Sequence, residues 1–292
     1  MSDLTKSVSF AGPVSGLVSG LSYSILMLAT IASGVGLVIP EVYRDNAWVT
    51  AQNRGTDLVT LVIVVPATLV VLAHYQRGSA RARLVLFGLL GYFFYVYTGA
   101  SLAYSFNYLF IVYVALFSLS ISALIALGIS MNASSLRRAF DANTPWRAVW
   151  IFMVWLAVML CIIWFSQILP FYLSGEIPQS IRDAGAPTMF VYVLDLGIVV
   201  PVAIIGAVWL RRGHHWGPVL AGFVLVKAAT IGLALLGMTW FVSRSSEPAD
   251  LELAILWALI ALAGLGMSYW FLKHCRGDRR LNRPISQKAG RR

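Results

Sequence analysis

Two charged residues stand alone inside long apolar segments of this 292-residue chain. Asp195 is the one charged residue of segment 189–210, and Lys227 is the one charged residue of segment 218–242. A charged side chain in hydrocarbon costs roughly 2.5–3.5 kcal/mol on insertion scales, and such residues typically bind ligands or ions or relay protons. Asp195 and Lys227 therefore predict either the polar anchors of a ligand or ion site, or a neutralised pair that fixes helix register.

Residues of the first half occupy the places that correspond to these two charges. An offset of 135 residues aligns Thr60 with Asp195 and Tyr92 with Lys227. Asp57 lies three residues before Thr60, and therefore on nearly the same helix face. The first half thus offers a carboxylate and a phenol where the second half offers a carboxylate and an ammonium. We expect this asymmetry to mark a site.

Two of these candidates also have a structural interpretation. Asp57 follows Thr56 after a polar stretch, so the two residues could cap a helix and place an acid in its first turn. Tyr92 and Tyr95 share a face and lie too deep for an interfacial aromatic belt. Their hydroxyls need partners, and the two rings either pack in the core or line a ligand cavity.

The offset of 135 also relates two longer motifs. Ile63-Val64-Val65-Pro66 corresponds to Ile198-Val199-Val200-Pro201, and Arg77-Gly78 corresponds to Arg212-Gly213. These matches predict an internal repeat of four spans plus four. Because four is an even number, both halves share one orientation, which gives a parallel repeat about an axis along the membrane normal. Pro66 and Pro201 should kink equivalent helices, either to shape packing or to open a cavity between the halves.

The composition excludes a soluble globular domain, a disordered chain and a disulfide scaffold. Hydrophobic residues make up 59% of the chain and charged residues 12%, and the mean hydropathy is +0.78. A helix needs about 20 apolar residues to cross a bilayer. We therefore predict an all-α membrane protein with eight transmembrane helices. They cover approximately 17–40, 58–75, 84–105, 108–130, 149–171, 189–210, 218–242 and 253–272.

Lysine and arginine predict the orientation of these spans. With the N-terminus in the cytoplasm, 17 of the 22 basic residues fall in cytoplasmic segments. The even number of spans then places both termini in the cytoplasm. The net charge of +10 reflects this bias and a basic tail facing anionic lipid head groups, so no nucleic-acid partner is expected.

The resulting organisation has five parts. A cytoplasmic N-terminal segment, 1–16, precedes the first four-helix repeat, 17–130. A cytoplasmic linker, 131–148, joins it to the second repeat, 149–272, and the basic tail covers 273–292. The short termini favour a bacterial cytoplasmic (inner) membrane.

The missing motifs leave the activity open. The sequence has no HExxH helix, no GxSxG elbow and no histidine within a span core, so no metal, haem or other cofactor is predicted. The leading hypothesis is a protein that binds or transports a small molecule or ion through an outward-facing intramembrane cavity. The alternatives are a scaffold or accessory subunit of a membrane complex and, as a weaker one, a membrane enzyme acting on a lipid-soluble substrate with an aspartate as general base.

Overall fold

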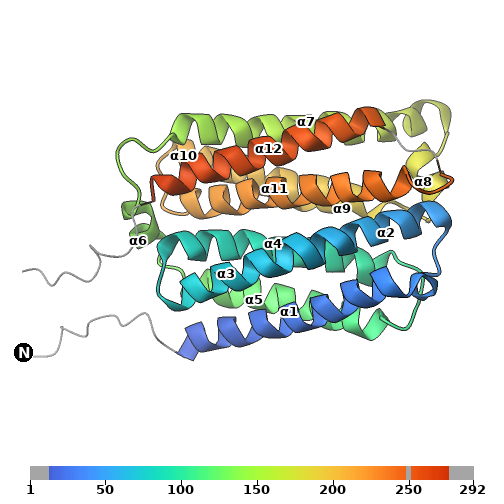
Figure 1. The fold of residues 1–292 in the computed structure, drawn as a ribbon. Helices are drawn as coiled ribbons and strands as arrows, with labels where there is room; N and C mark the ends of the chain where they lie inside the picture. The colour runs from blue at the N-terminus through green and yellow to red at the C-terminus, as the bar shows by residue number, and fades with distance from the viewer. Residues whose placement is uncertain (1–12, 248–250, 276–292) are drawn as a thin grey trace, which may run out of the picture.

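The computed structural model describes residues 13–247 and 251–275, all of which lie in helices, turns or short connections apart from one isolated β-bridge. Most of the predicted N-terminal segment, 1–16, and of the basic tail, 273–292, lies outside the described residues. The chain forms an elongated bundle of near-parallel helices (Figure 1).

Eight helices or helix runs are long and apolar enough to cross a membrane, which confirms the predicted number. The single helices are α1 (Pro13–Val38), α4 (Ala80–Leu102), α5 (Phe110–Ser130), α7 (Trp146–Ser174), α11 (Gly217–Val242) and α12 (Leu251–Lys273). The second span is the run α2 (Ala47–Val59), η2 (Thr60–Val64) and α3 (Val65–Gln76). The sixth span is the run α9 (Phe190–Leu194), η3 (Asp195–Val199) and α10 (Val200–Arg211). Three short helices lie between spans: η1 (Pro40–Val42), α6 (Ala133–Arg138) and α8 (Gln179–Ala184).

The second span starts eleven residues earlier than its apolar stretch predicts. Asn46 is the N-cap of α2, and its side-chain oxygen accepts a hydrogen bond from the Val49 amide at 2.9 Å. The polar residues that follow, including Asn53 and Thr56, are buried inside the bundle. The prediction that Thr56 and Asp57 cap this helix is therefore wrong, because both lie more than two turns inside it.

Pro66 and Pro201 each follow a five-residue π-helical turn. A proline inside an α-helix has no amide hydrogen and clashes with the carbonyl four residues earlier. In both spans the helix widens before the proline, and the Val65 and Val200 amides bond to the carbonyls of Thr60 and Asp195, five residues back. Both spans thus contain a π turn just before the proline, η2 and η3, whereas the kinks expected at Pro66 and Pro201 stay a prediction.

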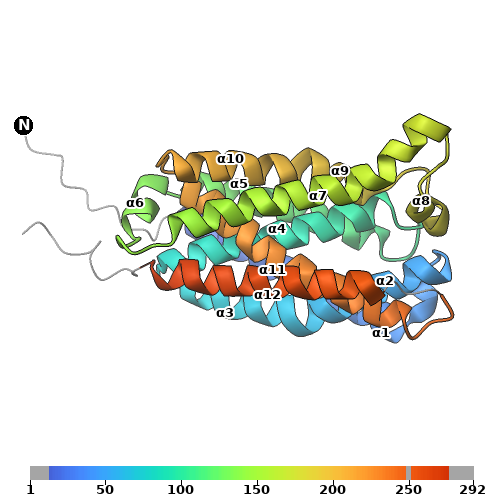
Figure 2. The ribbon, with the colours of Figure 1, turned by 90° about the horizontal axis from the view of Figure 1, so that it is seen from above.

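The core of the bundle lies around α4 and α11. In an apolar stretch of 18 residues taken from each span, 72% of α4 and 67% of α11 is buried. The corresponding share is 44% or less in every other span. The two helices cross near the middle of the bundle (Figure 2). Gly88 allows this approach, because a Cβ there would lie 2.5 Å from the Val226 Cβ. Gly91 faces the Phe223 ring, 2.3 Å from the position that its own Cβ would take.

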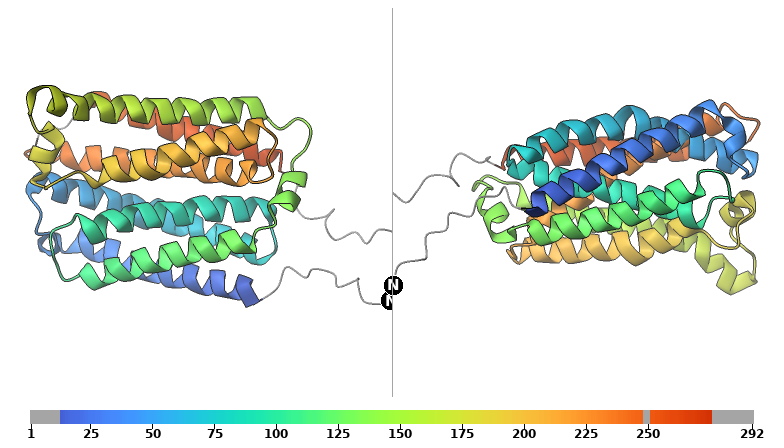
Figure 3. Two further views of the ribbon diagram at one scale, coloured as in Figure 1. Left: turned by 180° about the vertical axis from the view of Figure 1, so that it is seen from behind. Right: turned by 90° about the horizontal axis from the view of Figure 1, so that it is seen from below.

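The two ends of the bundle differ in their connections. The end that we call the α6 end holds α6, the start of α1 and the last turn of α12, whereas the α8 end holds α8 and η1 (Figures 1 and 3). At the α6 end, Asp141 forms an ion pair of 3.0 Å with His274. The Arg81 guanidinium donates to the carbonyl of Cys275 at 2.5 Å. These contacts hold the end of α12 against the start of α4 and against the segment that follows α6.

Candidate functional site

Asp195 lies at the start of η3 and is held by two donors from other helices. The Tyr95 hydroxyl of α4 donates to its Oδ1 at 3.0 Å, and the Trp164 indole of α7 donates to its Oδ2 at 2.9 Å. Only 6% of Asp195 is exposed. Three spans therefore converge on one carboxyl group in the interior of the bundle.

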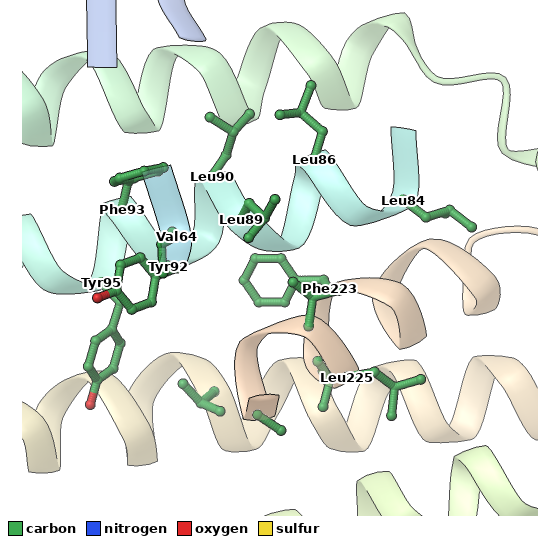
Figure 4. Packing of buried hydrophobic residues seen from close by; sticks show 14 of the residues in the cluster. Val64, Leu84, Leu86, Leu89, Leu90, Tyr92, Phe93, Tyr95, Phe223 and Leu225 are labelled. Carbon is green, nitrogen blue, oxygen red and sulfur yellow. The ribbon is translucent and has the colours of Figure 1, made fainter. Parts of the chain in front are cut away.

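Lys227 of α11 reaches the same place, but it contacts a ring and not a carboxylate. Its Nζ lies 3.5 Å from the centroid of the Tyr95 ring, the geometry of a cation–π interaction. Among the described residues, the one ion pair within 4 Å is Asp141–His274, so Lys227 and Asp195 do not form one. Tyr95 lies between the two charges, with its face to Lys227 and its hydroxyl to Asp195. Figure 4 shows the Tyr95 side chain leaving α4 away from the Leu84–Leu90 part of the core.

A short polar chain continues from this cluster towards the α8 end. The Trp164 ring packs against Tyr192, with 5.0 Å between centroids. The Tyr192 hydroxyl donates to Gln167 Oε1 at 2.8 Å and lies 2.6 Å from the Ser180 hydroxyl of α8. Polar groups thus connect the Asp195 cluster with the loop between α7 and α9.

Asp57 lies in a second cluster, formed by the first half of the chain. The Tyr43 hydroxyl, which comes from the connection after η1, donates to Asp57 Oδ2. Gly36 of α1 makes room for both groups, because a Cβ there would lie 2.1 Å from Asp57 Oδ2 and 2.5 Å from the Tyr43 oxygen. Burial, and then the neighbouring Asp57 carboxylate, hold the pKa of the Tyr43 phenol well above its usual range, so Tyr43 keeps its proton and acts as the donor.

Three further tyrosines extend the Asp57 cluster by ring contacts. Tyr104 packs edge-on against Tyr43 and against Tyr113, with centroid distances of 6.1 and 5.8 Å. Tyr113 in turn stacks on Tyr97 at 6.3 Å. All four rings are buried or nearly so. Through Tyr43, the carboxyl group of Asp57 therefore adjoins a group of tyrosine rings that contact one another and carry hydroxyl groups.

Thr60 and Tyr92, aligned with Asp195 and Lys227, contact each other directly. Their hydroxyl oxygens lie 2.7 Å apart, and both residues are almost fully buried. Figure 4 shows Tyr92 beside Val64, the last residue of η2. The first residue of each π turn thus bonds to a tyrosine of α4: Thr60 to Tyr92 within its own half, and Asp195 to Tyr95 of the other half.

The six predicted site residues therefore belong to two groups. Tyr95, Asp195 and Lys227 form one cluster, while Asp57 and the Thr60–Tyr92 pair lie in the first half. No described contact links the Asp57 cluster with Asp195, and a cavity with Asp195 and Lys227 as anchors and Tyr92 and Asp57 in its lining stays a prediction. Sequence reasoning missed Trp164 and Tyr43 as direct partners of the two carboxyl groups. Tyr43 carried a usable signal, since it is an aromatic residue in an otherwise polar connection.

Both clusters are closed to solvent in this conformation, because the exposed fractions of Asp57 and Lys227 are 9% and 5%. The surface of the described residues has shallow hollows, of which one lies at each end of the bundle. The hollow at the α8 end, of about 260 Å³, is lined by Arg44, Phe106, Asn107, Tyr108, Phe110 and Ile111. The other, of about 400 Å³, is lined by residues 129–134 with His215 and Trp216.

A metal centre is not indicated within residues 13–247 and 251–275, where no three His, Cys, Asp or Glu side chains gather in a way that could hold an ion. Comparison of the chain with protein-family models, with curated proteins and with solved structures gives no match.

Proposed function

We propose that this integral membrane protein binds or transports a small molecule or ion, with the Asp195–Tyr95–Lys227 cluster as its polar centre. One observation carries the proposal: inside the bundle, the Lys227 ammonium lies on the Tyr95 ring and not against the Asp195 carboxylate. Charged residues at membrane depth are functional by default, because their insertion costs free energy that an apolar residue would not.

The arrangement of the two charges argues against a purely structural pair. A pair that only fixes register is most stable when ammonium and carboxylate touch and hydrogen bonds satisfy the remaining atoms. Here the ring of Tyr95 separates them, so each charge keeps the capacity for an additional partner. When a ligand with a positive or a negative group enters, this group could replace the weaker contact, either that of Lys227 with the Tyr95 ring or a hydrogen bond to Asp195.

The π turn η3 supports a site at this position. π-Helical turns are rare in proteins and occur frequently at functional sites, because the wider turn leaves the backbone less regular. Asp195 is the first residue of η3. A change in this turn would move the Asp195 carboxyl relative to Tyr95 and Trp164 without breaking the rest of the span.

We infer further that the chain contains the parallel four-plus-four repeat, with residues 17–130 and 149–272 as its halves. The π turns η2 and η3 lie 135 residues apart, and Gly78 and Gly213 both adopt positive φ, of 83° and 74°. The contacts between the central helices support the same relation. Position 88 corresponds to position 223, and position 226 corresponds to position 91. The contact of Gly88 with Val226 therefore has its equivalent in the contact of Phe223 with Gly91, and both are present. Such reciprocal contacts are typical of a two-fold axis.

The repeat and the charge bias together support an orientation. We propose that the α6 end faces the cytoplasm of a bacterial cell and that the α8 end faces outward, with both termini inside. The described basic residues at the α6 end include Arg77, Arg81, Arg137 and Arg211, which fits the positive-inside rule. The basic tail would then lie at anionic lipid head groups.

Native mass spectrometry of the wild-type protein, extracted from the host membrane in mild detergent, tests the proposed site. The probe is whatever molecule the protein retains, seen as added mass that dissociates on collisional activation. We expect added mass in the wild type and its loss in Asp195→Asn and in Lys227→Met. Asp183→Asn is the matched control, because Asp183 lies in the exposed α8 segment.

The outcomes separate the hypotheses. Added mass that persists in both variants would place the ligand elsewhere and contradict the proposed centre. A wild-type spectrum without added mass, but with a stoichiometric second protein, would favour the scaffold or accessory subunit. A retained lipid that is chemically altered on incubation would favour the membrane enzyme.

A further inference from the structure

We propose that Asp57 is a proton-binding site, separate from the Asp195 cluster, that exchanges its proton with water at the α8 end. This inference goes beyond the proposed function, because it holds whether or not the Asp195 cluster takes a solute. It rests on the partners, burial and surroundings of the Asp57 carboxyl group.

The first step is that Asp57 is buried without a counter-ion. Only 9% of the residue is exposed. Among the described residues, no lysine, arginine or histidine nitrogen lies within 4 Å of its carboxyl oxygens. Arg54, one turn earlier, donates instead to the Leu37 carbonyl at 3.3 Å and lies over the Phe241 ring at 5.3 Å. A buried carboxylate without an ion pair is costly, and uptake of a proton removes that cost.

The second step is that both protonation states have partners. Tyr43 donates to Oδ2, which stabilises the carboxylate. The Ser33 hydroxyl of α1 is fully buried and faces the Asp57 carboxyl, but it makes no hydrogen bond with a described residue. A hydroxyl can donate or accept. Ser33 can therefore donate to the carboxylate or, after a rotation, accept the O–H of the protonated acid.

The third step is a route for the proton. The Tyr113 hydroxyl is buried, faces the side chains of Tyr43 and Asn107, and has no hydrogen-bond partner among the described residues. Asn107 also lines the surface hollow at the α8 end. Hydroxyl groups and the hollow thus form a series from the surface to Asp57. In the uptake step, a hydronium ion in the hollow loses a proton and becomes water, the Asp57 carboxylate gains that proton and becomes the neutral acid, and release reverses both changes.

The fourth step is the choice of ligand. The other titratable groups around Asp57 are tyrosines and one arginine, whose ordinary pKa values of about 10 and above about 12 leave the carboxyl as the group that titrates between about pH 4 and about pH 9. They are Tyr43, Arg54, Tyr92, Tyr97, Tyr104 and Tyr113. Gly36 packs directly on the carboxyl oxygen, so the site is tightly closed. A proton needs no additional volume, unlike a metal ion or an organic cation.

Infrared difference spectroscopy of the full-length protein in lipid nanodiscs tests this inference. Spectra are taken from about pH 4 to about pH 9, a range that spans the ordinary and raised values of carboxyl groups. We expect a carbonyl band of a buried protonated carboxyl that appears as the pH falls and shifts in D₂O. Asp57→Asn should remove this band, and Asp195→Asn should leave it in place.

Tyr43→Phe keeps the ring and removes the donor, so it serves if Asp57→Asn does not fold. It should retain the band but change its frequency and its pH midpoint, whereas Tyr172→Phe, at an exposed ring, should change neither. A band that survives in Asp57→Asn, or that Tyr43→Phe leaves unaltered, overturns the inference. Loss of ligand retention in Asp195 variants has no bearing on this band, so the two proposals fail separately.

Discussion

The ammonium of Lys227 lies 3.5 Å from the centre of the Tyr95 ring, and the hydroxyl of that same ring donates to Asp195. One side chain thus joins an ammonium on α11 to a carboxyl group on the sixth span. Because the ring face and the hydroxyl act on different partners, substitutions of Tyr95 can separate the two interactions.

Tyr95→Phe should remove one hydrogen bond and keep the cation–π contact. Leaving a buried acceptor without its donor costs about 1–3 kcal/mol, so we expect the free energy of unfolding to fall by this amount. Tyr95→Leu should cost more, because the Lys227 ammonium also loses the ring. Denaturant titration in mixed micelles measures both. Tyr172→Phe is the control, and a Tyr95→Phe protein as stable as this control would contradict the described geometry.

Asp195 and Lys227 should be energetically coupled although they do not touch. Either single substitution, Asp195→Asn or Lys227→Met, leaves one charge in the bundle interior without its opposite. The double variant removes both charges, and we expect it to be more stable than the sum of the single effects predicts, by about 0.5–3 kcal/mol. The same unfolding assay provides the double-mutant cycle.

Asp57→Asn combined with Lys227→Met is the reference cycle. These two residues share no described contact, so their effects should add to within about 0.5 kcal/mol. Strong coupling in the reference cycle would show that the two clusters respond to each other, contrary to the separation that the structure shows.

The sequence predicted the eight spans because each contains enough consecutive apolar residues to cross a bilayer. It misplaced the start of the second span, because Asn53, Thr56 and Asp57 turn their polar groups into the bundle and not towards water. Hydropathy averages all residues of a window, so the end of a helix that buries polar side chains scores like a loop.

The sequence singled out Tyr95, Asp195 and Lys227, which lie together in the structure, but it did not predict which of them touch. The charges suggested that Lys227 pairs with Asp195, whereas the group that Lys227 contacts is the Tyr95 ring of α4. Which side of α4 faces the second half depends on how α4 and α11 are rotated where they cross. That rotation follows from the packing of Gly88 and Gly91 against α11. Their partners on α11 lie about 135 residues away in the sequence, so no local sequence pattern can pair them.

The crossing of α4 and α11 predicts a graded response to alanine. In Gly88→Ala the new methyl group meets the Val226 Cβ, which moves only with its backbone, so we expect a loss of about 1–3 kcal/mol. In Gly91→Ala it meets the end of the Phe223 ring, which can rotate away, so the loss should be smaller. Gly34→Ala is the control, since nothing lies within 4 Å of its Cβ position. Equal stabilities for all three variants would rule out this close crossing.

The contacts at the α6 end predict a protected thiol. Cys275 is fully buried, its carbonyl accepts from Arg81, and the adjacent His274 pairs with Asp141. In a Cys161→Ser background, Cys275 is the sole thiol of the chain. We expect it to react slowly with a maleimide and faster after Asp141→Asn or Arg81→Gln, because either change loosens the end of α12. If the contact contributes one or two kcal/mol, labelling should accelerate about 5- to 30-fold.

The rate of maleimide labelling, followed by mass spectrometry, checks this prediction, and Asp183→Asn at the opposite end of the bundle is its control. Labelling of the unsubstituted Cys275 at the rate seen in denaturant would mean that the end of α12 is not held in the membrane-embedded protein. Unchanged slow labelling in both Asp141→Asn and Arg81→Gln would instead assign the protection to the packing of Phe271 against Phe140 and Trp146, whose ring centroids lie 4.6 and 5.9 Å from that of Phe271. The first result would contradict the view that contacts at the α6 end hold α12 in place. The second would attribute the protection of Cys275 to aromatic packing and not to the polar contacts.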